Sequence, residues 1–312
     1  MTRRVACIGA GTVGHAWAVV FARAGYEVSL FDAKPGEVRD HALPDVRTTL
    51  QVLADGGMLT EAVDSIASRV HDAASISEAV AGAVYVQESV REDVSVKRQV
   101  FATIAAAAPA DAILASSTSA IKGSEFLVDI PAPMRALVAH PVNPPAFIPL
   151  VELCGTGITS RTTIDATHRL LSDAGMKPIV LNKEIDGFIL NRLQYTLVAE
   201  ALHLVGEGYC SAEDIDRAMT EGLALRWAFI GPFAVAHLNA VDGFRGFVDR
   251  LGPMMRRMGE DAQTDYDWTG DQISEIHAEL TKSFPVEDLP RFREDRDRNI
   301  LRLLNLREAE TI

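Results

Sequence analysis

The sequence VACIGAGTVGHAWAVVFARAGYEVSLFD, residues 5–32, decides the fold of the N-terminal part of the chain. It begins within a short apolar run, residues 4–8, that predicts a strand and is followed by a glycine-rich turn. Residues 12–24 have apolar side chains at helical spacing, and Gly25, a common type of C-cap residue, follows them. A second apolar run then leads into Asp32. The stretch therefore predicts a strand–helix–strand unit.

The glycines of the turn form the pattern G-x-G-x-x-G, made of Gly9, Gly11 and Gly14. In a dinucleotide-binding turn the first glycine permits the tight bend, the second lets the backbone approach a pyrophosphate, and the third lets the helix pack close to the sheet. The free N–H groups of Thr12 and Val13 at the helix N-terminus are then expected to face the phosphates. An ordinary strand-to-helix turn is the alternative, and the strand and helix on either side argue against it.

An acidic residue closes the second strand of the unit. Asp32 is expected to accept hydrogen bonds from the adenosine ribose hydroxyls, and its charge would repel a 2′-phosphate. The sequence therefore predicts NAD rather than NADP as the cofactor. Lys34, two residues further on, would soften that preference.

Strand patterns continue to alternate with helical ones up to about residue 184. Further strands are expected at residues 83–87, 113–116, 135–139, 150–153 and 178–181. Further helices are expected at residues 94–108 and 161–174, and two more within 35–70, broken near Gly56 and Gly57. This alternation predicts an α/β fold with a Rossmann-like, mostly parallel sheet that helices cover on both faces.

The chain changes character after about residue 184. From Gly187 to residue 312 the sequence is helical in pattern, with long apolar stripes. We therefore expect an NAD-binding Rossmann-like domain at residues 1–184 and an all-helical substrate and dimerisation domain at residues 185–312. The stripes fit a homodimer interface and burial within the domain equally well.

Composition narrows the functional classes. The chain has 312 residues, which suits two domains, and a formal net charge of −13, which argues against binding nucleic acid or an anionic membrane. Its three widely spaced cysteines predict neither a disulfide framework nor a zinc site, and no metal is expected. The N-terminus lacks the apolar stretch of a signal peptide, and the Ala-rich run at 101–109 is too short to span a bilayer. We expect a cytoplasmic protein.

Polar motifs follow or lie in three of the predicted strands: SSTSA at 116–120, AHPVNPP at 139–145 and PLVEL at 149–153. In open α/β sheets, functional groups gather outside the carboxyl ends of the strands. Ser119, His140 and Asn143 are therefore expected to converge there. Glu152 follows His140 by twelve residues across a proline-rich turn.

These residue types suit the oxidation of a secondary alcohol. The hydroxyl proton must be removed while hydride leaves for a nicotinamide, and histidine has a suitable unperturbed pKa for the proton step. A carboxylate such as Glu152 would fix the imidazole tautomer and stabilise the imidazolium. A serine hydroxyl and an asparagine amide would bond the substrate oxygen. Singly, each residue is more often structural, but together, behind a dinucleotide motif, they favour catalysis.

At this point the chain resembles a known family, the L-3-hydroxyacyl-CoA dehydrogenase superfamily, over nearly its whole length. The strings that carry the resemblance are GAGTVG, QESVREDVSVKRQVF, ASSTSA, HPVNPP and GFILNR, in the family's order and spacing. The resemblance implies a Rossmann-like domain followed by a helical dimerisation domain. His140 and Glu152 resemble the family's catalytic dyad. Ser119 and Asn191 resemble its substrate-oxygen contacts, and Glu92 and Lys97 resemble its further cofactor contacts on the nicotinamide side.

Within the superfamily the chain resembles the lambda-crystallin and L-gulonate 3-dehydrogenase branch, at the strings AHPVNPPAFIPLVEL and EGLALRWAFIGP. It also resembles the neighbouring carnitine dehydrogenase branch, at the string LRWAF. Ser117, where the acyl-CoA enzymes usually have Asn, also fits the gulonate-like branch. Gulonate and carnitine are free carboxylates with a 3-hydroxyl, and arginine binds a carboxylate bidentately. Arg226 is therefore the hypothetical carboxylate clamp, and an ion pair with a structural acid is its alternative.

The leading interpretation is an NAD-dependent dehydrogenase of a small free 3-hydroxy carboxylate, similar to L-gulonate 3-dehydrogenase. A short-chain L-3-hydroxyacyl-CoA dehydrogenase or a carnitine 3-dehydrogenase stays open, although the scarcity of basic residues at 34–70 argues mildly against CoA. An NAD-binding, crystallin-like structural protein stays open too, and the joint presence of the serine, histidine, glutamate and asparagine argues against it. Asp186, where the family commonly has a small residue, has no explanation from the sequence.

Overall fold

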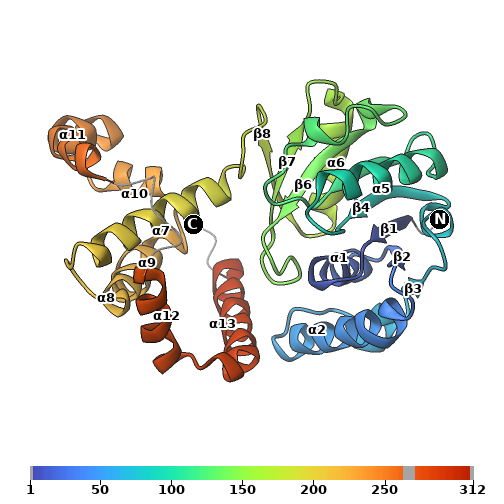
Figure 1. Cartoon of the computed structure of the whole chain (residues 1–312), viewed down its shortest axis with the longest axis horizontal. Coiled ribbons are helices and arrows are strands. Elements are labelled where there is room, and N and C mark those ends of the chain that lie inside the picture. The colour runs from blue at the N-terminus through green and yellow to red at the C-terminus, as the bar shows by residue number, and fades with distance from the viewer. Residues whose placement is uncertain (1–2, 263–270, 310–312) are drawn as a thin grey trace. The chain divides into compact units, whose positions relative to one another are not determined.

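The computed structural model describes residues 3–262 and 271–309 (Figure 1). The chain divides into two compact units, each described here by itself: Met1–Arg192 with Asp297–Leu306, and Leu193–Arg296 with Arg307–Ile312. The helical prediction for residues 263–270 and 310–312 lies outside the described residues. The roles assigned to residues 1–184 and 185–312 stay predictions.

The first unit is built on an eight-stranded sheet in the order β3-β2-β1-β4-β5-β6-β7-β8. Its strands are β1 (Arg4–Ile8), β2 (Glu27–Phe31), β3 (Val70–Asp72), β4 (Ala83–Glu88), β5 (Ile113–Ser116), β6 (Ala136–Pro141), β7 (Leu150–Gly155) and β8 (Lys177–Leu181). All neighbouring strands pair in parallel except β6 and β7, which are antiparallel. The predicted Rossmann-like, mostly parallel sheet is confirmed.

Helices join these strands. They are α1 (Thr12–Arg23), the π-helical turn η1 (Val38–Ala42), α2 (Leu43–Asp55), α3 (Val63–Ala67), α4 (Ile76–Val80), α5 (Val94–Ala107), the 3-10 turns η2 (Gly123–Glu125) and η3 (Pro133–Arg135), and α6 (Arg161–Asp173). Local sequence sets several of their ends. Asp93 accepts hydrogen bonds from the first turn of α5, and Ser160 does the same for α6.

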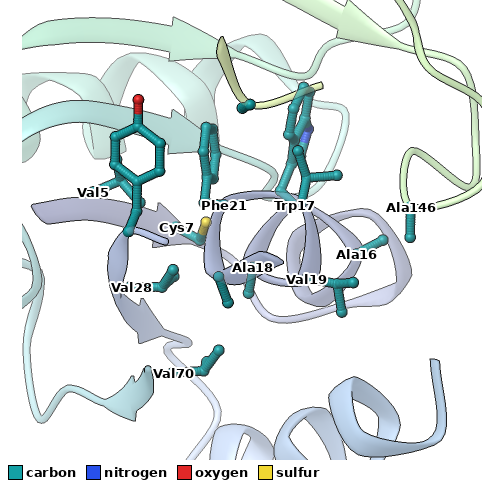
Figure 2. Packing of buried hydrophobic residues seen from close by; sticks show 14 of the residues in the cluster. Val5, Cys7, Ala16, Trp17, Ala18, Val19, Phe21, Val28, Val70 and Ala146 are labelled. Carbon is teal, nitrogen blue, oxygen red and sulfur yellow. The ribbon is translucent and has the colours of Figure 1, made fainter. Parts of the chain in front are cut away.

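Alternate residues of the strands belong to two separate cores, one on each face of the sheet. On β1, Val5 and Cys7 join the core that contains α1 and α2, whereas Ala6 and Ile8 join the core that contains α4 and α5. Figure 2 shows the first of these cores, in which side chains of α1 lie over β1. Because both faces are covered, the strands read as continuous apolar runs in the sequence.

One strand and one α-helix of the first unit were missed by the sequence analysis. β3 has three residues and pairs only with β2 at the end of the sheet. α4 has five residues, and the Ser75 side chain caps it by accepting a hydrogen bond from the Glu78 N–H. Both elements are too short for a period of two or of 3.6 residues to stand out.

The second unit is helical over the residues that the structure describes. Its elements, some of which extend into the first unit, are α7 (Leu190–Gly206), α8 (Ala212–Arg217), η4 (Ala218–Leu223), α9 (Ala224–Trp227), α10 (Pro232–Leu238), α11 (Gly243–Asp261), α12 (Asp271–Ser283), η5 (Val286–Asp288) and α13 (Leu289–Ala309). The expected all-helical C-terminal part is confirmed. None of the described helices combines the length and the apolar composition that crossing a membrane requires.

Candidate active site

The predicted dyad lies in one β-hairpin. The register of β6 and β7 puts His140 directly opposite Glu152, and His140 Nδ1 lies 2.8 Å from Glu152 Oε2. Both side chains are buried, with 7% and 0% of their surface exposed. Because β7 runs against β6, the start of β7 reaches the edge of the sheet where β6 ends. The two residues therefore meet at the carboxyl edge of the parallel strands.

The second oxygen of the Glu152 carboxylate binds the beginning of α7. Oε1 accepts hydrogen bonds from the backbone N–H groups of Ile189, at 2.8 Å, and Leu190, at 3.0 Å. With these donors on one oxygen and the imidazole on the other, the carboxylate serves as an acceptor only. His140 Nδ1 is then the donor in its bond to Glu152. The neutral imidazole consequently keeps its lone pair on Nε2, where a base needs it.

Phe188 covers the imidazole and was not among the predicted site residues. Its ring centroid lies 5.3 Å from that of His140, and its side chain is fully buried. Phe188 has a φ of +50°, directly after Gly187 at +72°. A positive φ is costly for a bulky residue, so the surrounding contacts must hold this turn in place. The sequence analysis placed Phe188 inside the helical pattern that starts at Gly187, but α7 begins only at Leu190, because Gly187 and Phe188 have positive φ.

Ser119 and Asn191 are hydrogen-bonded to each other, but through the backbone of the serine and not through its hydroxyl. The Asn191 side-chain amide donates to the Ser119 carbonyl oxygen at 2.9 Å, and the Ser119 side chain is exposed. The amide has a second N–H and a carbonyl oxygen that this bond does not use. Asn143 is exposed in the loop between β6 and β7.

Glu92 and Lys97 lie together with Glu88, which the sequence analysis did not select; Glu88 and Lys97 are buried, whereas Glu92 is partly exposed. Lys97 Nζ lies 2.9 Å from Glu88 Oε1 and 3.3 Å from Glu92 Oε2. Burial raises the pKa of the Glu88 carboxyl above its usual range, and Lys97 and the Ser116 hydroxyl oppose that shift. Burial also opposes ionisation of Glu92, but its hydrogen bonds and Lys97 hold its pKa below the usual range. The sequence offered one signal for Glu88, namely a carboxylate at the end of a strand, where functional groups gather in open α/β sheets.

In the glycine-rich turn, side chains at Gly9 and Gly14 would collide with neighbouring backbone, whereas Gly11 borders open space. A Cβ added to Gly14 would lie 1.8 Å from the Gly9 carbonyl oxygen, and Gly9 has a φ of +98°. A Cβ on Gly11 would meet no atom within 4 Å. No side chain caps α1, so the N–H groups of Thr12 and Val13 face this space without an intrahelical acceptor. These features fit a bound pyrophosphate.

Asp32 holds the same turn from the neighbouring strand. Its carboxylate accepts hydrogen bonds from the backbone N–H groups of Ala10, at 2.8 Å, and Lys34, at 2.9 Å. A carboxylate fixed beside the glycine turn suits the ribose hydroxyls of NAD, and this role of Asp32 stays a prediction. The Lys34 ammonium pairs with Glu37.

Replacement of Gly14 by alanine should weaken NAD binding by about 5- to 150-fold, because overpacking of this kind costs roughly 1–3 kcal/mol. The new methyl group would collide with the backbone of the turn, and no flexible side chain can give way there. Titration calorimetry with NAD+ measures the effect. Gly157→Ala is the matched control, because a Cβ at Gly157 meets no atom within 4 Å. Binding by G14A within twofold of the wild type would contradict this assignment of Gly14.

Ser117 connects the cofactor turn to the strand ends. Its Oγ accepts hydrogen bonds from Trp17 Nε1 at 3.1 Å and Gln87 Nε2 at 2.7 Å, and it lies 2.8 Å from Ser89 Oγ. With two donors on its oxygen, the Ser117 hydroxyl is left to donate to Ser89. Ser89 also lies under the turn, since its carbonyl oxygen is 2.5 Å from where a Cβ of Gly9 would be.

Asp186 and Arg226 complete the residues selected from the sequence. Asp186 Oδ1 lies 3.1 Å from Lys122 Nζ, which gives this aspartate a partner in the loop after Ser119. Arg226 belongs to α9 in the second unit. Its side chain is exposed and forms no ion pair with another residue in the described part of the chain.

Two family models match the chain in succession. The 3-hydroxyacyl-CoA dehydrogenase NAD binding domain matches residues 4–185, and the 3-hydroxyacyl-CoA dehydrogenase C-terminal domain matches residues 187–268. The chain belongs to the 3-hydroxyacyl-CoA dehydrogenase family. Proteins of the 3-hydroxyacyl-CoA dehydrogenase family are NAD-dependent dehydrogenases that act on 3-hydroxy groups, and NAD is the cofactor of this chain.

Individual members of the 3-hydroxyacyl-CoA dehydrogenase family are similar to most of the chain. Lambda-crystallin of Oryctolagus cuniculus is 37% identical over 307 residues, which are 97% of this chain and 96% of that protein. L-carnitine dehydrogenase of Nocardiopsis dassonvillei is 40% identical over 256 residues, which are 81% of this chain and 76% of that protein.

Solved structures show the same likeness. That of 5-formyl-3-hydroxy-2-methylpyridine 4-carboxylic acid 5-dehydrogenase, an NAD+-dependent dismutase, has a TM-score of 0.85 and 27% identity, over 99% of this chain and 100% of that chain. That of (S)-3-hydroxybutyryl-CoA dehydrogenase from Ralstonia eutropha has a TM-score of 0.67 and 30% identity, over 81% of this chain and 88% of that chain.

Proposed function

We propose that the protein oxidises the 3-hydroxyl group of a small free hydroxy carboxylate, as L-gulonate 3-dehydrogenase does, with His140 as the base. The observation that carries the proposal is the buried hydrogen bond of 2.8 Å between His140 Nδ1 and Glu152 Oε2. This bond holds the imidazole in the tautomer whose Nε2 can accept a proton.

The chain's own residues would divide the work of the reaction as follows. His140 Nε2 takes the hydroxyl proton, and Glu152 stabilises the imidazolium that forms. The Ser119 hydroxyl and the free N–H of the Asn191 amide bond the substrate oxygen, and the exposed Asn143 contacts the remainder of the substrate. NAD, when bound, accepts the hydride from the substrate carbon.

The turn and the acidic cluster would hold NAD. Gly9, Gly11 and Gly14, with the N–H groups of Thr12 and Val13, receive the pyrophosphate. Asp32 receives the adenosine ribose. Glu92 and Lys97 would serve the nicotinamide side, where Glu92 is partly exposed and Lys97 is buried.

Ion pairing argues for a free acid over a CoA thioester. CoA carries phosphates that need unpaired basic groups. Each of the four basic residues at 34–70 pairs with a carboxylate: Lys34 with Glu37, Arg39 with Asp40, Arg47 with Asp64, and Arg69 with Glu61. Arg226, by contrast, is exposed and has no such partner among the described residues. We therefore assign it to the substrate carboxylate.

A substrate panel tests the proposal. NADH formation at alkaline pH would be measured with L-gulonate, L-carnitine, L-3-hydroxybutyrate and the CoA thioester of the last. Turnover of a free acid, with the thioester poor, is expected. Preference for the thioester would instead make the protein a short-chain L-3-hydroxyacyl-CoA dehydrogenase. NADH binding without turnover of any 3-hydroxy compound would favour a crystallin-like structural role.

Arg226→Met should raise the KM for the preferred free acid by about 10- to 100-fold, because a hydrogen bond to a charged group contributes roughly 1.5–3 kcal/mol. The matched control is Arg217→Met, which removes another exposed arginine of the second unit, one that pairs with Glu213. An unchanged KM in R226M would remove the carboxylate clamp from the proposal and leave the dyad untouched.

We further propose that the protein is a cytoplasmic homodimer. The exposed apolar side chains of α7, among them Leu193, Leu197 and Val198, support an interface between two copies. Sedimentation equilibrium that gives the mass of one chain would contradict the dimer.

A further inference from the structure

Glu88 is a buried carboxylate that none of the roles above uses. We propose that Glu88 is a positioning residue for the reaction: it fixes the Lys97 ammonium, Lys97 fixes Glu92, and Glu92 fixes the backbone of Ser119. The catalytic consequence rests on the proposed function, whereas the positioning of the backbone does not.

The first step of this chain of contacts is a fully buried ion pair. Lys97 Nζ lies 2.9 and 3.2 Å from the two oxygens of Glu88, and the side chains are 1% and 0% exposed. The ammonium also lies 5.9 Å from the centroid of the Phe126 ring. A buried ammonium is stable only with well-placed partners. Glu88 itself is held by the Ser116 hydroxyl and the Val90 N–H, so Lys97 is anchored to the ends of β4 and β5.

The second step joins Lys97 to the loop that carries Ser119. Glu92 Oε2 lies 3.3 Å from Lys97 Nζ. Its other oxygen accepts hydrogen bonds from the Thr118 hydroxyl at 2.6 Å and the N–H groups of Ser119 at 2.8 Å and Ala120 at 3.1 Å. One carboxylate oxygen thus gathers three consecutive residues. Displacing Glu92 would release all of them together.

The third step is a second hydrogen bond to the backbone of Ser119, made by Asn191. Its N–H is held by Glu92, and its carbonyl oxygen accepts the Asn191 amide at 2.9 Å. The backbone is fixed on both sides while the hydroxyl stays exposed. Such support matters because a displacement of about 1 Å at a reacting group costs roughly 100-fold in rate. Glu88 therefore acts on the Ser119 backbone through two intermediate residues, Lys97 and Glu92.

A purely structural ion pair is the competing explanation. Replacement of such a pair by apolar residues commonly preserves stability. If Glu88 and Lys97 only filled the core, apolar replacements would keep both the fold and the wild-type exchange rate of the Ser119 amide. If they position Ser119, a stable apolar pair would still exchange the Ser119 and Ala120 amides faster than the wild type.

A double-mutant cycle tests the proposal in the full chain, with the variants Glu88→Gln, Glu92→Gln and the pair of both. E88Q should lower kcat by about 10- to 100-fold. In the E92Q background the same change should cost less than about twofold more, because both act on the same loop. Glu61→Gln, which breaks an exposed pair with Arg69, is the control and should keep the wild-type kcat.

Hydrogen exchange of the Ser119 and Ala120 amides gives a readout that does not depend on turnover. Exchange at these amides should be at least about tenfold faster in E88Q than in the wild type. Unchanged exchange, or kcat within threefold of the wild type, overturns the proposal. If the wild type oxidised no 3-hydroxy acid, the proposed function would fail, and the exchange rates alone would decide the positioning role.

A second variant covers the case in which E88Q does not fold. The pair Glu88→Leu with Lys97→Met removes both buried charges at once and should keep the melting temperature close to that of the wild type. Fast amide exchange at residues 118–120 with low kcat is expected in this stable protein. Wild-type exchange and kcat would show that the ion pair only fills the core.

Discussion

His140→Ala lowers kcat by about 10²- to 10⁴-fold and leaves NAD binding intact, if His140 is the base of the reaction. The substitution removes the proton acceptor, whereas the glycine turn and Asp32 belong to other strands and lose no contact. Steady-state kinetics with the preferred substrate, together with calorimetric titration of NAD+, measure the two effects separately.

His71→Ala is the matched control for this variant. His71 also lies on a strand and bonds a glutamate, with its Nε2 2.7 Å from Glu27 Oε2, but the pair is on the surface. H71A should keep the wild-type kcat. If activity survived in H140A as well, the dyad assignment would be wrong.

Glu152→Gln should lower kcat by roughly 10²- to 10⁴-fold although it changes a single atom. The carboxylate accepts from His140 on one oxygen and from the N–H groups of Ile189 and Leu190 on the other. A glutamine has only one oxygen to offer. If that oxygen stays with the α7 N–H groups, the amide NH2 faces Nδ1. The imidazole must then move its proton to Nε2, which can no longer act as the base.

The opposite orientation of the new amide is no better. Its NH2 would then face two backbone N–H donors in a fully buried place, which costs about 1–3 kcal/mol for unsatisfied groups. Kinetics and thermal unfolding of E152Q distinguish the two orientations. Glu27→Gln makes the same change in the surface pair with His71 and serves as the control. A kcat within threefold of the wild type in E152Q would contradict the tautomer argument.

Much of the fold was predictable because its signals are local. The glycine turn, Gly25 and the closing Asp32 lie within one strand–helix–strand unit, and the apolar runs of a doubly covered sheet stand out from their neighbours. β3 and α4 were not predictable from periodicity, because three and five residues give no full repeat.

The site was predictable only in part, for a related reason. The sequence places His140 and Glu152 on either side of one proline-rich turn, and the antiparallel pairing of β6 and β7 sets them opposite each other. Glu88, Lys97 and the loop at 118–120 come from separate segments, and only the sheet order brings them together. Phe188 contacts His140 through a backbone conformation with positive φ, which residue types alone do not reveal.

The antiparallel pairing of β6 and β7 has an evolutionary consequence. The hydrogen-bonded ladder sets His140 against Glu152. Residues 142–149 connect the two strands; Ala146 and Phe147 pack into the core, whereas Asn143 is exposed. Surface connections accept insertions and exchanges far more readily than the strands they join. Related sequences could therefore differ at exposed positions of this loop such as Asn143, and in the alcohols that they accept, while the pairing of His140 with Glu152 stays the same.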